Sequence, residues 1–453
     1  MLIHAERALL PEGWARDVGV RVEGGRIVAA TAGSGGPAAG TQRVGCLLPA
    51  PVNLHSHMFQ RAMAGMTERR SAGQDSFWTW RSLMYRFLDR LTPEDVEAIA
   101  AHVMVEMAEA GYAAVAEFHY LHHQPAGAPY ANIAEMSERI VNAAEETGFG
   151  LTLLPVLYQR GGCDGRALTS GQMRFGNDVE RFARLWEGAA AAVRQLPDGV
   201  TGVAPHSLRA VDPAGLRMAE GIAPVAPIHI HVAEQVAEVE EVSAAYGARP
   251  VEWLLDNFAV DGRWCPIHCT QMTAGETVAL ARSGAVAGLC PITEANLGDG
   301  IFDGVRFLGA GGRWGVGSDS NVRISLAEEL RLFEYSQRLR DRGRAMLADG
   351  ARSTGRVLWD GAVAGGAQAA GRASGAIAVG AVADLVALDM GSVHLDGREG
   401  DEVLDAFVFA GNDGLVAEVW SAGRHVVTGG RHVAREGVER RFRAVMAALR
   451  ERM

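Results

Sequence analysis

The middle of the chain alternates short apolar runs with longer stretches of helical periodicity. Eight of the runs have the length and the residue content of buried strands. They are the run that ends at His55, then YAAVAEF, FGLTLLPV, GVTGVAP, APIHIHV, RWCPIH, AVAGLCP and RWGVGSD. Strands that alternate with helices predict right-handed βαβ crossovers in a parallel sheet, and eight such units predict a closed (β/α)8 TIM-type barrel of about 300 residues.

The clearest predicted helix is LTPEDVEAIAAHVMVEMAEAG, between the first two predicted strands. Thr92 is suited to the N-cap, Pro93 to the first turn and Asp95 to the capping-box position. Gly111 follows the last turn, where a helix commonly ends. The pattern therefore predicts both ends of this helix.

The two ends of the chain have a different pattern. VGVRVEGGRIVAA alternates around a Gly-Gly turn, and GAIAVGAVADLVALDM and LVAEVWSAGRHVVTGGRHV are also β-like with glycine turns. We expect residues 1–48 and 368–434 to fold together as a small β-sandwich domain beside a barrel that spans residues 49–367. Residues 435–453 are expected to form a surface helix.

Composition narrows the class of protein. Hydrophobic residues make up 48% of the chain and charged residues 21%, which is typical of a globular protein with a large core. The net charge is −11 and no basic tail or stripe is present, so we expect no nucleic-acid partner. No signal peptide or run of membrane-spanning length is apparent, and the five cysteines are scattered, so we expect a cytoplasmic protein without a membrane partner.

The chain contains no lysine, because all 43 of its basic residues are arginine. This absence excludes Schiff-base chemistry and a P-loop lysine. It also excludes a pair of metal ions bridged by a carbamylated lysine.

Histidine and carboxylate residues, which can bind metal ions, lie where several of the predicted strands end. Barrel enzymes have their active sites at this end of the strands. These residues are His55 and His57 after the first strand, His231 and Glu234 at the fifth, His268 at the sixth and Asp319 after the eighth. His55 and His57 share one face of their strand because they are two residues apart. This pair alone is weak evidence, since two polar residues that close a strand would look the same.

The complete set is much more specific than the pair. Three imidazoles and a carboxylate, from His55, His57, His231 and Asp319, make a plausible site for zinc or another divalent first-row metal ion, with one position left for water. Glu234 and His268 then remain for acid–base chemistry.

Two further histidines fit a structural interpretation better. His229 shares the face of His231 but lies deeper along the strand, so we expect an interior histidine there. His119, in EFHYLHH, is near enough to the barrel mouth to be considered, but we do not expect it to bind the metal.

The chain resembles the amidohydrolase superfamily along its whole length, and its mononuclear deaminase branch in particular. The resemblance is carried by HSH, HVAE, the histidine after strand six and SD after strand eight, and by GAIAVGAVADLVALD and VWSAGRHVVTGGR near the carboxyl end. Binuclear members commonly use a carbamylated lysine after strand four. The corresponding segment here is VAPHSLRAV, which agrees with a single metal ion.

A closer resemblance is to the N-formimino-L-glutamate deiminases. It is carried by LHSHMFQRAMAGMTE, EFHYLHH, APHSLRAV, HIHVAEQ, CPITEANLGDGIF and GVGSDSN, which extend beyond the ligand positions. The resemblance implies a homodimer with one zinc ion per subunit that acts in histidine degradation. The implied reaction hydrolyses the formimino group to release ammonia and N-formyl-L-glutamate.

This chemistry suits the residues at the strand ends. Zinc lowers the pKa of a bound water from 15.7 toward about 7. Glu234 is placed to receive the water's proton and pass it to the imino nitrogen, and Asp319 to orient the water and help move the second proton. His268 is placed to hydrogen-bond the attacking oxygen and stabilise the tetrahedral intermediate.

The implied substrate carries two carboxylates, which an acidic protein must bind with local cations. Arg209, four residues past the end of the fourth predicted strand, is the best candidate, because a guanidinium pairs with a carboxylate through two hydrogen bonds. His206 stands beside it in the sequence. The resemblance adds Gln60, Arg81 and Tyr120 as substrate contacts.

Three alternatives remain open. A mononuclear deaminase of a purine, pyrimidine or related ring would keep the same metal ligands but need an apolar slot for the ring. A hydrolase that opens an imidazolone-type ring would differ only in its pocket. A non-catalytic scaffold on the same barrel is expected to have lost ligands or the acid–base residue, and this chain has the full set.

Overall fold

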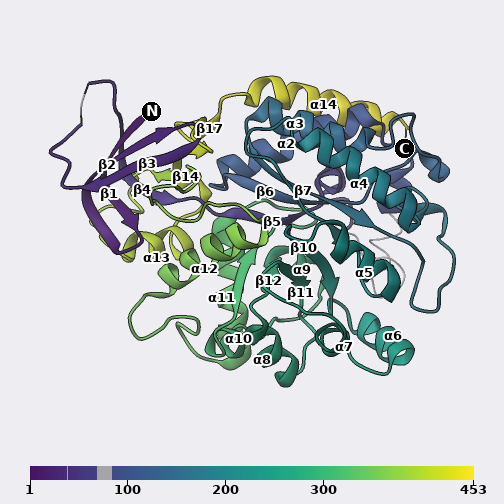
Figure 1. Ribbon diagram of the computed structural model, residues 1–453. Coiled ribbons are helices and arrows are strands. Elements are labelled where there is room, and N and C mark those ends of the chain that lie inside the picture. Colours follow the sequence, from purple (N-terminus) through teal and green to yellow (C-terminus); the bar gives the residue numbers. More distant parts are fainter. Residues whose placement is uncertain (38, 69–83, 453) are drawn as a thin grey trace.

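The computed structural model describes residues 1–37, 39–68 and 84–452, and it contains the predicted barrel (Figure 1). The barrel strands follow the order of the eight predicted runs. They are β5 (Val52–Ser56), β6 (Ala114–His119), β7 (Gly150–Leu157), the short pieces β8 (Val200–Thr201) and β9 (Ala204–Pro205), β10 (Ile228–Val232), β11 (Trp264–His268), β12 (Val286–Leu289) and β13 (Arg313–Val316).

The strands hydrogen-bond as two parallel arcs that isolated bridges join into a ring. One arc is β5-β6-β7-β8, with β9 also paired to β7, and the other is β10-β11-β12-β13. Parallel bridges from Val203 to Ile228 and from Ser56 to Asp319 connect the arcs. The second bridge joins the first strand to the turn after the last one, so barrel closure itself brings the HSH segment beside Asp319.

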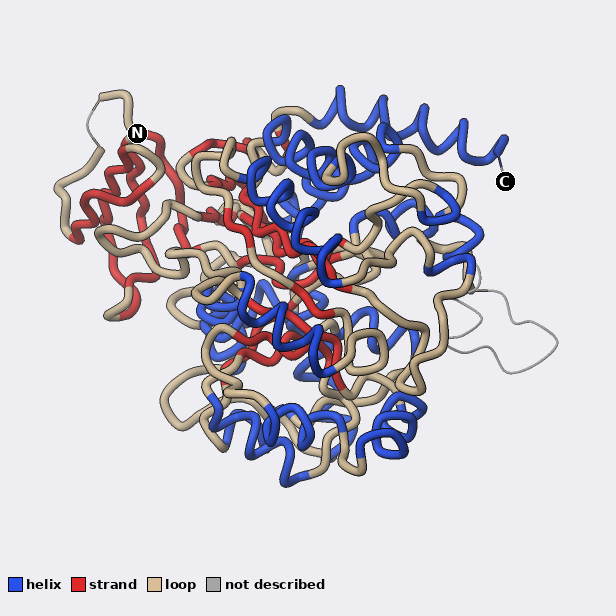
Figure 2. Tube along the Cα trace, turned by 45° about the vertical axis from the view of Figure 1, so that its right-hand side comes forward, coloured by secondary structure: helices blue, strands red, loops and turns tan. Residues whose placement is uncertain are grey.

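Helices lie outside the strands and cover the barrel (Figure 2). In chain order they are α2 (Pro93–Glu109), α3 (Glu135–Thr147), α4 (Val179–Val193), α5 (Pro213–Ile222), α6 (Val236–Tyr246), α7 (Pro250–Asn257), α8 (Ala274–Ser283), α9 (Pro291–Leu297), α10 (Gly304–Gly309), α11 (Leu326–Asp341) and α12 (Thr354–Ala369). Short 3-10 turns occupy Met58–Met63 (η1), Pro125–Gly127 (η2), Ser170–Gln172 (η3) and Asp413–Leu415 (η4). Among the described residues, the helices include none that is long and apolar enough to cross a membrane.

Helix α2 begins and ends as its sequence predicts. The Thr92 hydroxyl accepts the backbone N–H of Asp95 at 3.2 Å, and the Asp95 carboxylate accepts the N–H of Thr92 at 3.0 Å. Gly111 has a φ of +100°, a conformation that an L-residue rarely adopts, directly after the C-cap. These contacts satisfy backbone groups that a helix end otherwise leaves unpaired.

Strands from both chain ends form one sheet beside the barrel. They are β1 (Leu2–Leu10), β2 (Gly13–Glu23), β3 (Arg26–Ala32) and β4 (Gln42–Pro49) from the amino end, and β14 (Leu385–Leu388), β15 (Val416–Ser421), β16 (Arg424–Thr428) and β17 (Arg431–His432) from the carboxyl end. Their order is β17-β16-β15-β14-β4-β1-β2-β3. The β-domain from both ends is therefore present, but its strands share one continuous sheet where we expected the two sheets of a sandwich.

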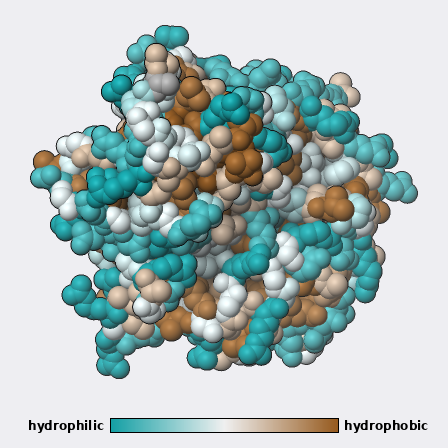
Figure 3. Space-filling model, turned by 60° about the vertical axis from the view of Figure 1, so that its left-hand side comes forward, coloured by the Kyte–Doolittle hydropathy of each residue, from teal (hydrophilic) through white to brown (hydrophobic). Residues whose placement is uncertain are grey.

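Strand β4 joins the two halves of this sheet, because it pairs parallel with β1 and antiparallel with β14. One buried core cluster of the domain combines residues from both chain ends, including Ile3, Val20, Leu385 and Trp420. Figure 3 shows the molecule with the side of the β-domain turned forward. On this face, apolar side chains lie in small groups among hydrophilic ones.

The remaining helices in the described part of the chain are α13 (Glu402–Phe409) and α14 (Arg435–Arg452). Helix α14 runs along the outside of the barrel against α2 (Figure 1). His102 of α2 stacks on Phe442 of α14, with ring centroids 4.0 Å apart. An ion pair between Arg435 and Glu109 fastens the start of α14 to the end of α2.

Candidate active site

Four buried side chains converge at the carboxyl ends of the barrel strands. His55 lies in β5 and His57 directly follows it, His231 lies in β10, and Asp319 follows β13. Each offers a ligand atom, and these atoms all lie within 4.8 Å of one another. Nε2 of His57 is 3.2 Å from Oδ1 of Asp319, and the Nε2 atoms of His55 and His231 are 3.1 Å apart. The structure thus brings together the four predicted metal ligands.

The turn after β13 is held against β5 by Asn321, which the sequence analysis did not single out. Its side-chain amide donates to the hydroxyl of Ser56, to the backbone carbonyl of His57 and to the backbone carbonyl of Asp319, each at 3.1 Å. Asp319 and Asn321 have φ values of 47° and 53°, so this turn lies in the left-handed region. The amide network holds a sparsely populated backbone conformation in place beside the ligand atoms.

Backbone carbonyls orient two of the three imidazoles. Nδ1 of His57 lies 3.0 Å from the carbonyl oxygen of Phe118, and Nδ1 of His231 lies 3.1 Å from that of His206. A ring that donates from Nδ1–H to a carbonyl presents the Nε2 lone pair on its other side, which is the arrangement found around protein-bound metal ions. Both lone pairs then face the cluster.

Burial and neighbouring side chains together determine the charge state of these ligands. It lowers the pKa of His55 to about 3, and it also lowers the pKa of His57 and of His231. Burial alone would raise the pKa of Asp319, but the imidazoles of His55 and His268 keep it below its usual range. The neutral ring and the ionised carboxylate are the forms that bind metal.

This donor set fits one divalent cation. It consists of three imidazole nitrogens and one carboxylate oxygen, as in catalytic zinc sites with one open position. The Nε2 atoms of His55 and His231 are 3.1 Å apart, a separation at which both can reach one cation at the usual Zn–N distance of about 2.0 to 2.1 Å.

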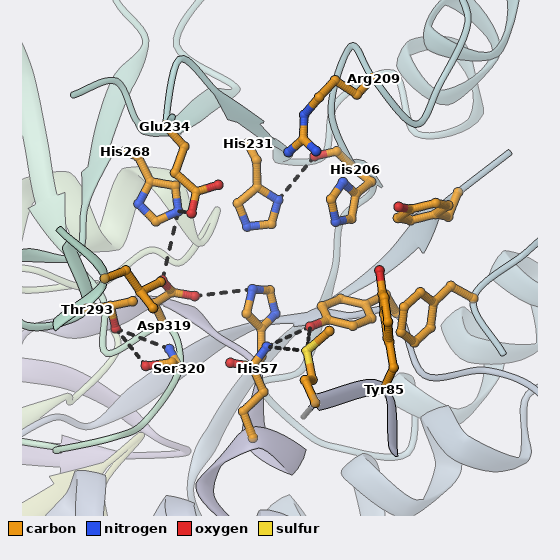
Figure 4. Close-up of a pocket in the computed structure, with 16 residues that line it drawn as sticks. His57, Tyr85, His206, Arg209, His231, Glu234, His268, Thr293, Asp319 and Ser320 are labelled. Carbon is orange, nitrogen blue, oxygen red and sulfur yellow. Dashed lines mark hydrogen bonds and ion pairs between the residues drawn. The ribbon is translucent and has the colours of Figure 1, made fainter. Parts of the chain in front are cut away.

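Glu234 and His268 lie next to the ligand cluster (Figure 4). Nε2 of His268 is 3.9 Å from Oε1 of Glu234 and 3.9 Å from Oδ2 of Asp319. Ala233, with a φ of 53°, turns the chain after β10, and Glu234 directly follows this turn. The two predicted acid–base residues are therefore adjacent and buried.

The pKa values of Glu234 and His268 are both raised, but for different reasons. Burial raises the pKa of Glu234, as does the charge of Asp319, while His268 opposes this rise. Burial would lower the pKa of His268, but the carboxylates of Glu234, Glu294 and Asp319 raise it to about 10. Glu234 thus holds a proton more readily than an exposed glutamate does, and the cationic form of His268 is favoured.

One pocket is lined by three of the four ligand residues, by the acid–base pair and by several predicted substrate contacts. Arg209 is buried at the wall, and its side chain lies near His231 and His206 (Figure 4). Its Nε atom has no hydrogen-bond partner among the described residues. A buried guanidinium with an unused donor suits an anionic ligand.

Gln60 and Tyr120 form another part of the wall. The Gln60 amide donates to the Tyr120 hydroxyl at 2.6 Å, and Oε1 of Gln60 is buried without a partner among the described residues. His206 lies nearby, with its ring 4.9 Å from that of His231. Arg81, the remaining predicted contact, lies outside the described residues.

The two histidines interpreted as structural lie apart from the four ligand atoms. Nε2 of His229 is 2.8 Å from the carbonyl oxygen of Ala369, which accounts for its buried ring. His119 packs against His122, with ring centroids 5.2 Å apart.

Some residues that line or support the pocket were not found from the sequence. Thr293 and Ser320 line it, and their hydroxyl oxygens are 2.9 Å apart. Glu294 contacts His268 through its carboxylate. All three lie within CPITEANLGDGIF and GVGSDSN, so the length of these motifs was the available signal.

A (β/α)8 barrel with a cluster of metal-ligand residues at the carboxyl ends of its strands and an adjacent buried acid–base pair is typical of metal-dependent hydrolases. The family model described as amidohydrolase family matches residues 46–426. The chain belongs to the amidohydrolase family. A second model, described as the N-terminal domain of formimidoylglutamate deiminase HutF, matches residues 1–43.

Similar proteins and structures agree with this assignment. The chain is 50% identical over 451 residues to a formimidoylglutamate deiminase of Pseudomonas aeruginosa, with 99% of each chain covered. It is 27% identical to a 5-methylthioadenosine/S-adenosylhomocysteine deaminase of Natronomonas pharaonis, covering 86% of this chain and 84% of that one.

Solved structures show the same fold. A crystal structure of an amidohydrolase from Brucella melitensis has a TM-score of 0.95 at 50% identity, with 99% of each chain covered. An adenosine deaminase from Xanthomonas campestris with bound zinc has a TM-score of 0.83 at 21% identity, covering 99% of this chain and 98% of that one. The second likeness concerns the fold alone.

Proposed function

We propose that this chain hydrolyses N-formimino-L-glutamate to N-formyl-L-glutamate and ammonia, a step of histidine degradation. The observation that carries the proposal is the 50% identity, over 99% of both chains, to the Pseudomonas aeruginosa formimidoylglutamate deiminase. The pocket supports it, because a metal-ligand cluster, an acid–base pair and a buried guanidinium line the same cavity.

His55, His57, His231 and Asp319 are the proposed ligands of one zinc ion. Three neutral imidazoles and a carboxylate make the donor set that favours zinc over harder cations such as Mg²⁺. When bound, the ion supplies Lewis-acid chemistry and lowers the pKa of a water molecule toward about 7.

Glu234 carries the proton transfer in this proposal. The formimino carbon is bonded to two nitrogens, and hydrolysis forms a bond from that carbon to the oxygen of water and breaks its bond to the imino nitrogen. Glu234 takes one proton from the water and delivers it to the imino nitrogen, and its raised pKa helps the carboxyl to hold that proton. Asp319 helps to transfer the second water proton, so the nitrogen leaves as ammonia.

His268 donates from Nε2 to the attacking oxygen. The ring is fully buried and lies 3.9 Å from both Glu234 and Asp319, so the reacting oxygen fits among the three side chains. A fixed donor at the atom where negative charge develops stabilises the tetrahedral intermediate more than the ground state.

Arg209 is proposed to bind a substrate carboxylate through a two-pronged ion pair. His206, Gln60 and Tyr120 complete the contacts, together with Arg81 by family resemblance. This assignment predicts an acyclic dianion as the substrate, because Arg209 and, by family resemblance, Arg81 would each pair with one carboxylate.

The test is ammonia release from N-formimino-L-glutamate, measured beside a panel of purine and pyrimidine amines. We expect release from the formimino compound and none from the ring amines. Release from a ring amine alone would keep the metal site but contradict the substrate.

We also propose that the chain forms a homodimer in the cytoplasm, as the family resemblance implies. Light scattering after size-exclusion chromatography tests the first part. We expect twice the 48.1 kDa mass of one chain, and a monomeric mass at micromolar concentration would contradict it.

A further inference from the structure

Behind the ring of His268, on the side away from the pocket, lies a buried carboxylate. Oε1 of Glu294, from helix α9, is 3.3 Å from Nδ1 of His268. The same oxygen accepts the backbone N–H of Cys290 at 2.9 Å. Glu294 is only 5% exposed and does not line the pocket, so water and substrate do not compete for this carboxylate.

The ring of His268 stacks on that of His231, with centroids 5.5 Å apart, but few hydrogen bonds constrain it. Its nearest carboxylate oxygens on the pocket side, from Glu234 and Asp319, are each 3.9 Å away, beyond hydrogen-bond distance. His268 and Cys269 have φ values of 72° and 54°, so the ring stands at a left-handed turn that ends β11. Among the described residues, Glu294 is the hydrogen-bond partner of this imidazole.

Glu294 is itself held rigidly at the start of α9. Its backbone N–H donates to the carbonyl of Cys290 at 2.8 Å, and its own carbonyl accepts from Asp299 at 2.9 Å. A second buried carboxyl, that of Glu329, accepts the N–H of Ile292 in the same turn at 2.9 Å. The first turn of α9 is thus anchored on two sides, and only one of its two anchoring carboxyls touches His268.

We propose that Glu294 is a positioning residue that acts through His268. By accepting from Nδ1–H, it fixes the rotation of the ring, so that Nε2 faces the space between Glu234 and Asp319. The partner of the distal nitrogen commonly fixes the working nitrogen of a histidine in this way. The role assigned to His268 rests on the proposed function, whereas the carboxylate–imidazole contact does not.

The cluster has one competing interpretation. His268, Cys290 and Glu294 each offer a ligand atom within 4.8 Å of the others, which could indicate a second metal site. We do not favour it, because Oε1 of Glu294 already accepts from the Cys290 N–H and from His268. A second equivalent of metal in the wild type that is absent from Glu294→Gln would overturn the positioning role.

The kinetic test compares three variants of the metal-loaded enzyme. Glu294→Ala should lower kcat for ammonia release about 100-fold or more while KM changes less than threefold, because substrate does not touch Glu294. Glu294→Gln keeps an acceptor oxygen for His268 and for the Cys290 N–H. Its kcat should therefore be at least tenfold higher than that of Glu294→Ala. Glu329→Gln is the matched control: it changes the other anchor of α9, and its kcat should stay within threefold of the wild type.

Two kinetic outcomes would contradict the proposal. A loss of kcat in Glu329→Gln as large as that in Glu294→Ala would mean that both carboxyls merely stabilise α9. Wild-type kcat in Glu294→Ala would mean that the ring needs no such partner.

A proton NMR measurement tests the contact without any substrate. We expect a downfield Nδ1–H resonance that disappears in His268→Asn, shifts in Glu294→Gln and is unchanged in Glu329→Gln. A resonance that Glu294→Gln leaves in place would overturn the pairing. If the wild type released no ammonia from the formimino compound, the proposed function would fail, while this resonance would still decide the pairing.

Discussion

The single side chains of the pocket owe their chemical character to burial and to their neighbours. His55 and Glu234 are both buried, yet burial keeps the first neutral, as a metal ligand must be, and helps the second to hold a proton. The identities and spacing of these residues were readable from the sequence because each stands at a strand end. The contact of Glu294 was not readable, since it depends on how α9 packs behind β11, 26 residues away in the chain.

Replacing Glu234 with glutamine removes the group that transfers a proton but keeps its size. We expect kcat to fall by a factor on the order of 10² to 10⁴, the usual contribution of a positioned acid–base group. Metal content should stay at one equivalent, because Glu234 is not among the four ligands. Near-normal turnover would remove Glu234 from the proton-transfer role.

Replacing Arg209 with methionine removes the proposed carboxylate partner from the pocket wall. A hydrogen-bonded charge pair is worth about 1.5 to 3 kcal/mol, so we expect KM to rise roughly 10-fold to 100-fold. Arg181→Met is a suitable control, since Arg181 pairs with the exposed Asp178 outside the pocket. An unchanged KM together with a lower melting temperature would show that Arg209 is structural.

At the scale of elements, the site depends on the contact between the first barrel strand and the turn after the last. The strand pattern predicted both β5 and β13, and a ring of eight strands makes them neighbours. The pattern did not predict Asn321, because its role follows from a left-handed turn that is not visible as a periodicity. Three hydrogen bonds from the Asn321 side-chain amide align Asp319 with the HSH segment.

Replacing Asn321 with alanine should therefore weaken metal binding. Loss of groups that orient metal ligands typically costs 10-fold to 100-fold in affinity, and we expect a loss of about that size. Competition with a chelator measures it, and Asn257→Ala, which alters a remote helix end, is the control. Equal metal affinity in both variants would show that the turn holds its shape without the amide.

At the scale of the whole molecule, the barrel and the sheet are joined by buried charges. Arg372, which follows α12, pairs with Asp384 at 2.5 Å and with Asp198 at 2.6 Å. Asp198 precedes barrel strand β8, and Asp384 precedes sheet strand β14. The sequence predicted a domain from both chain ends but not its single sheet. Strand β4 pairs with both β1 and β14, and local sequence patterns do not indicate which distant strands pair.

Replacing Arg372 with methionine leaves the buried carboxylate of Asp384 without its cation, while Asp198 keeps its ion pair with Arg424. We expect the free energy of unfolding to fall by about 3 to 5 kcal/mol, the cost of breaking a buried pair. Arg352→Met, which removes an exposed pair with Asp349, should cost no more than about 1 kcal/mol. Denaturant titrations of both variants measure the difference, and equal losses would contradict the linking role.

The same cluster should contribute to stability in a pH-dependent way. Burial would raise the pKa of Asp198, but the guanidiniums of Arg424 and Arg372 lower it below its usual range. A carboxyl with a lowered folded-state pKa stabilises the fold above its unfolded pKa of about 3.9, and this contribution is lost as pH falls through the folded value. Asp198→Asn should therefore reduce stability at pH 7 and flatten the decline of stability as pH falls below about 4. An equally steep acid decline in the variant would contradict this.

The central claim is that one metal ion held by His55, His57, His231 and Asp319 serves the hydrolysis of N-formimino-L-glutamate. The most direct measurement strips the metal with a chelator and then adds zinc back in small steps while ammonia release is followed. We predict that activity is lost on stripping and rises linearly to a plateau at one zinc per chain. Undiminished release by the metal-free chain, or a plateau only at two zinc ions per chain, would contradict the account.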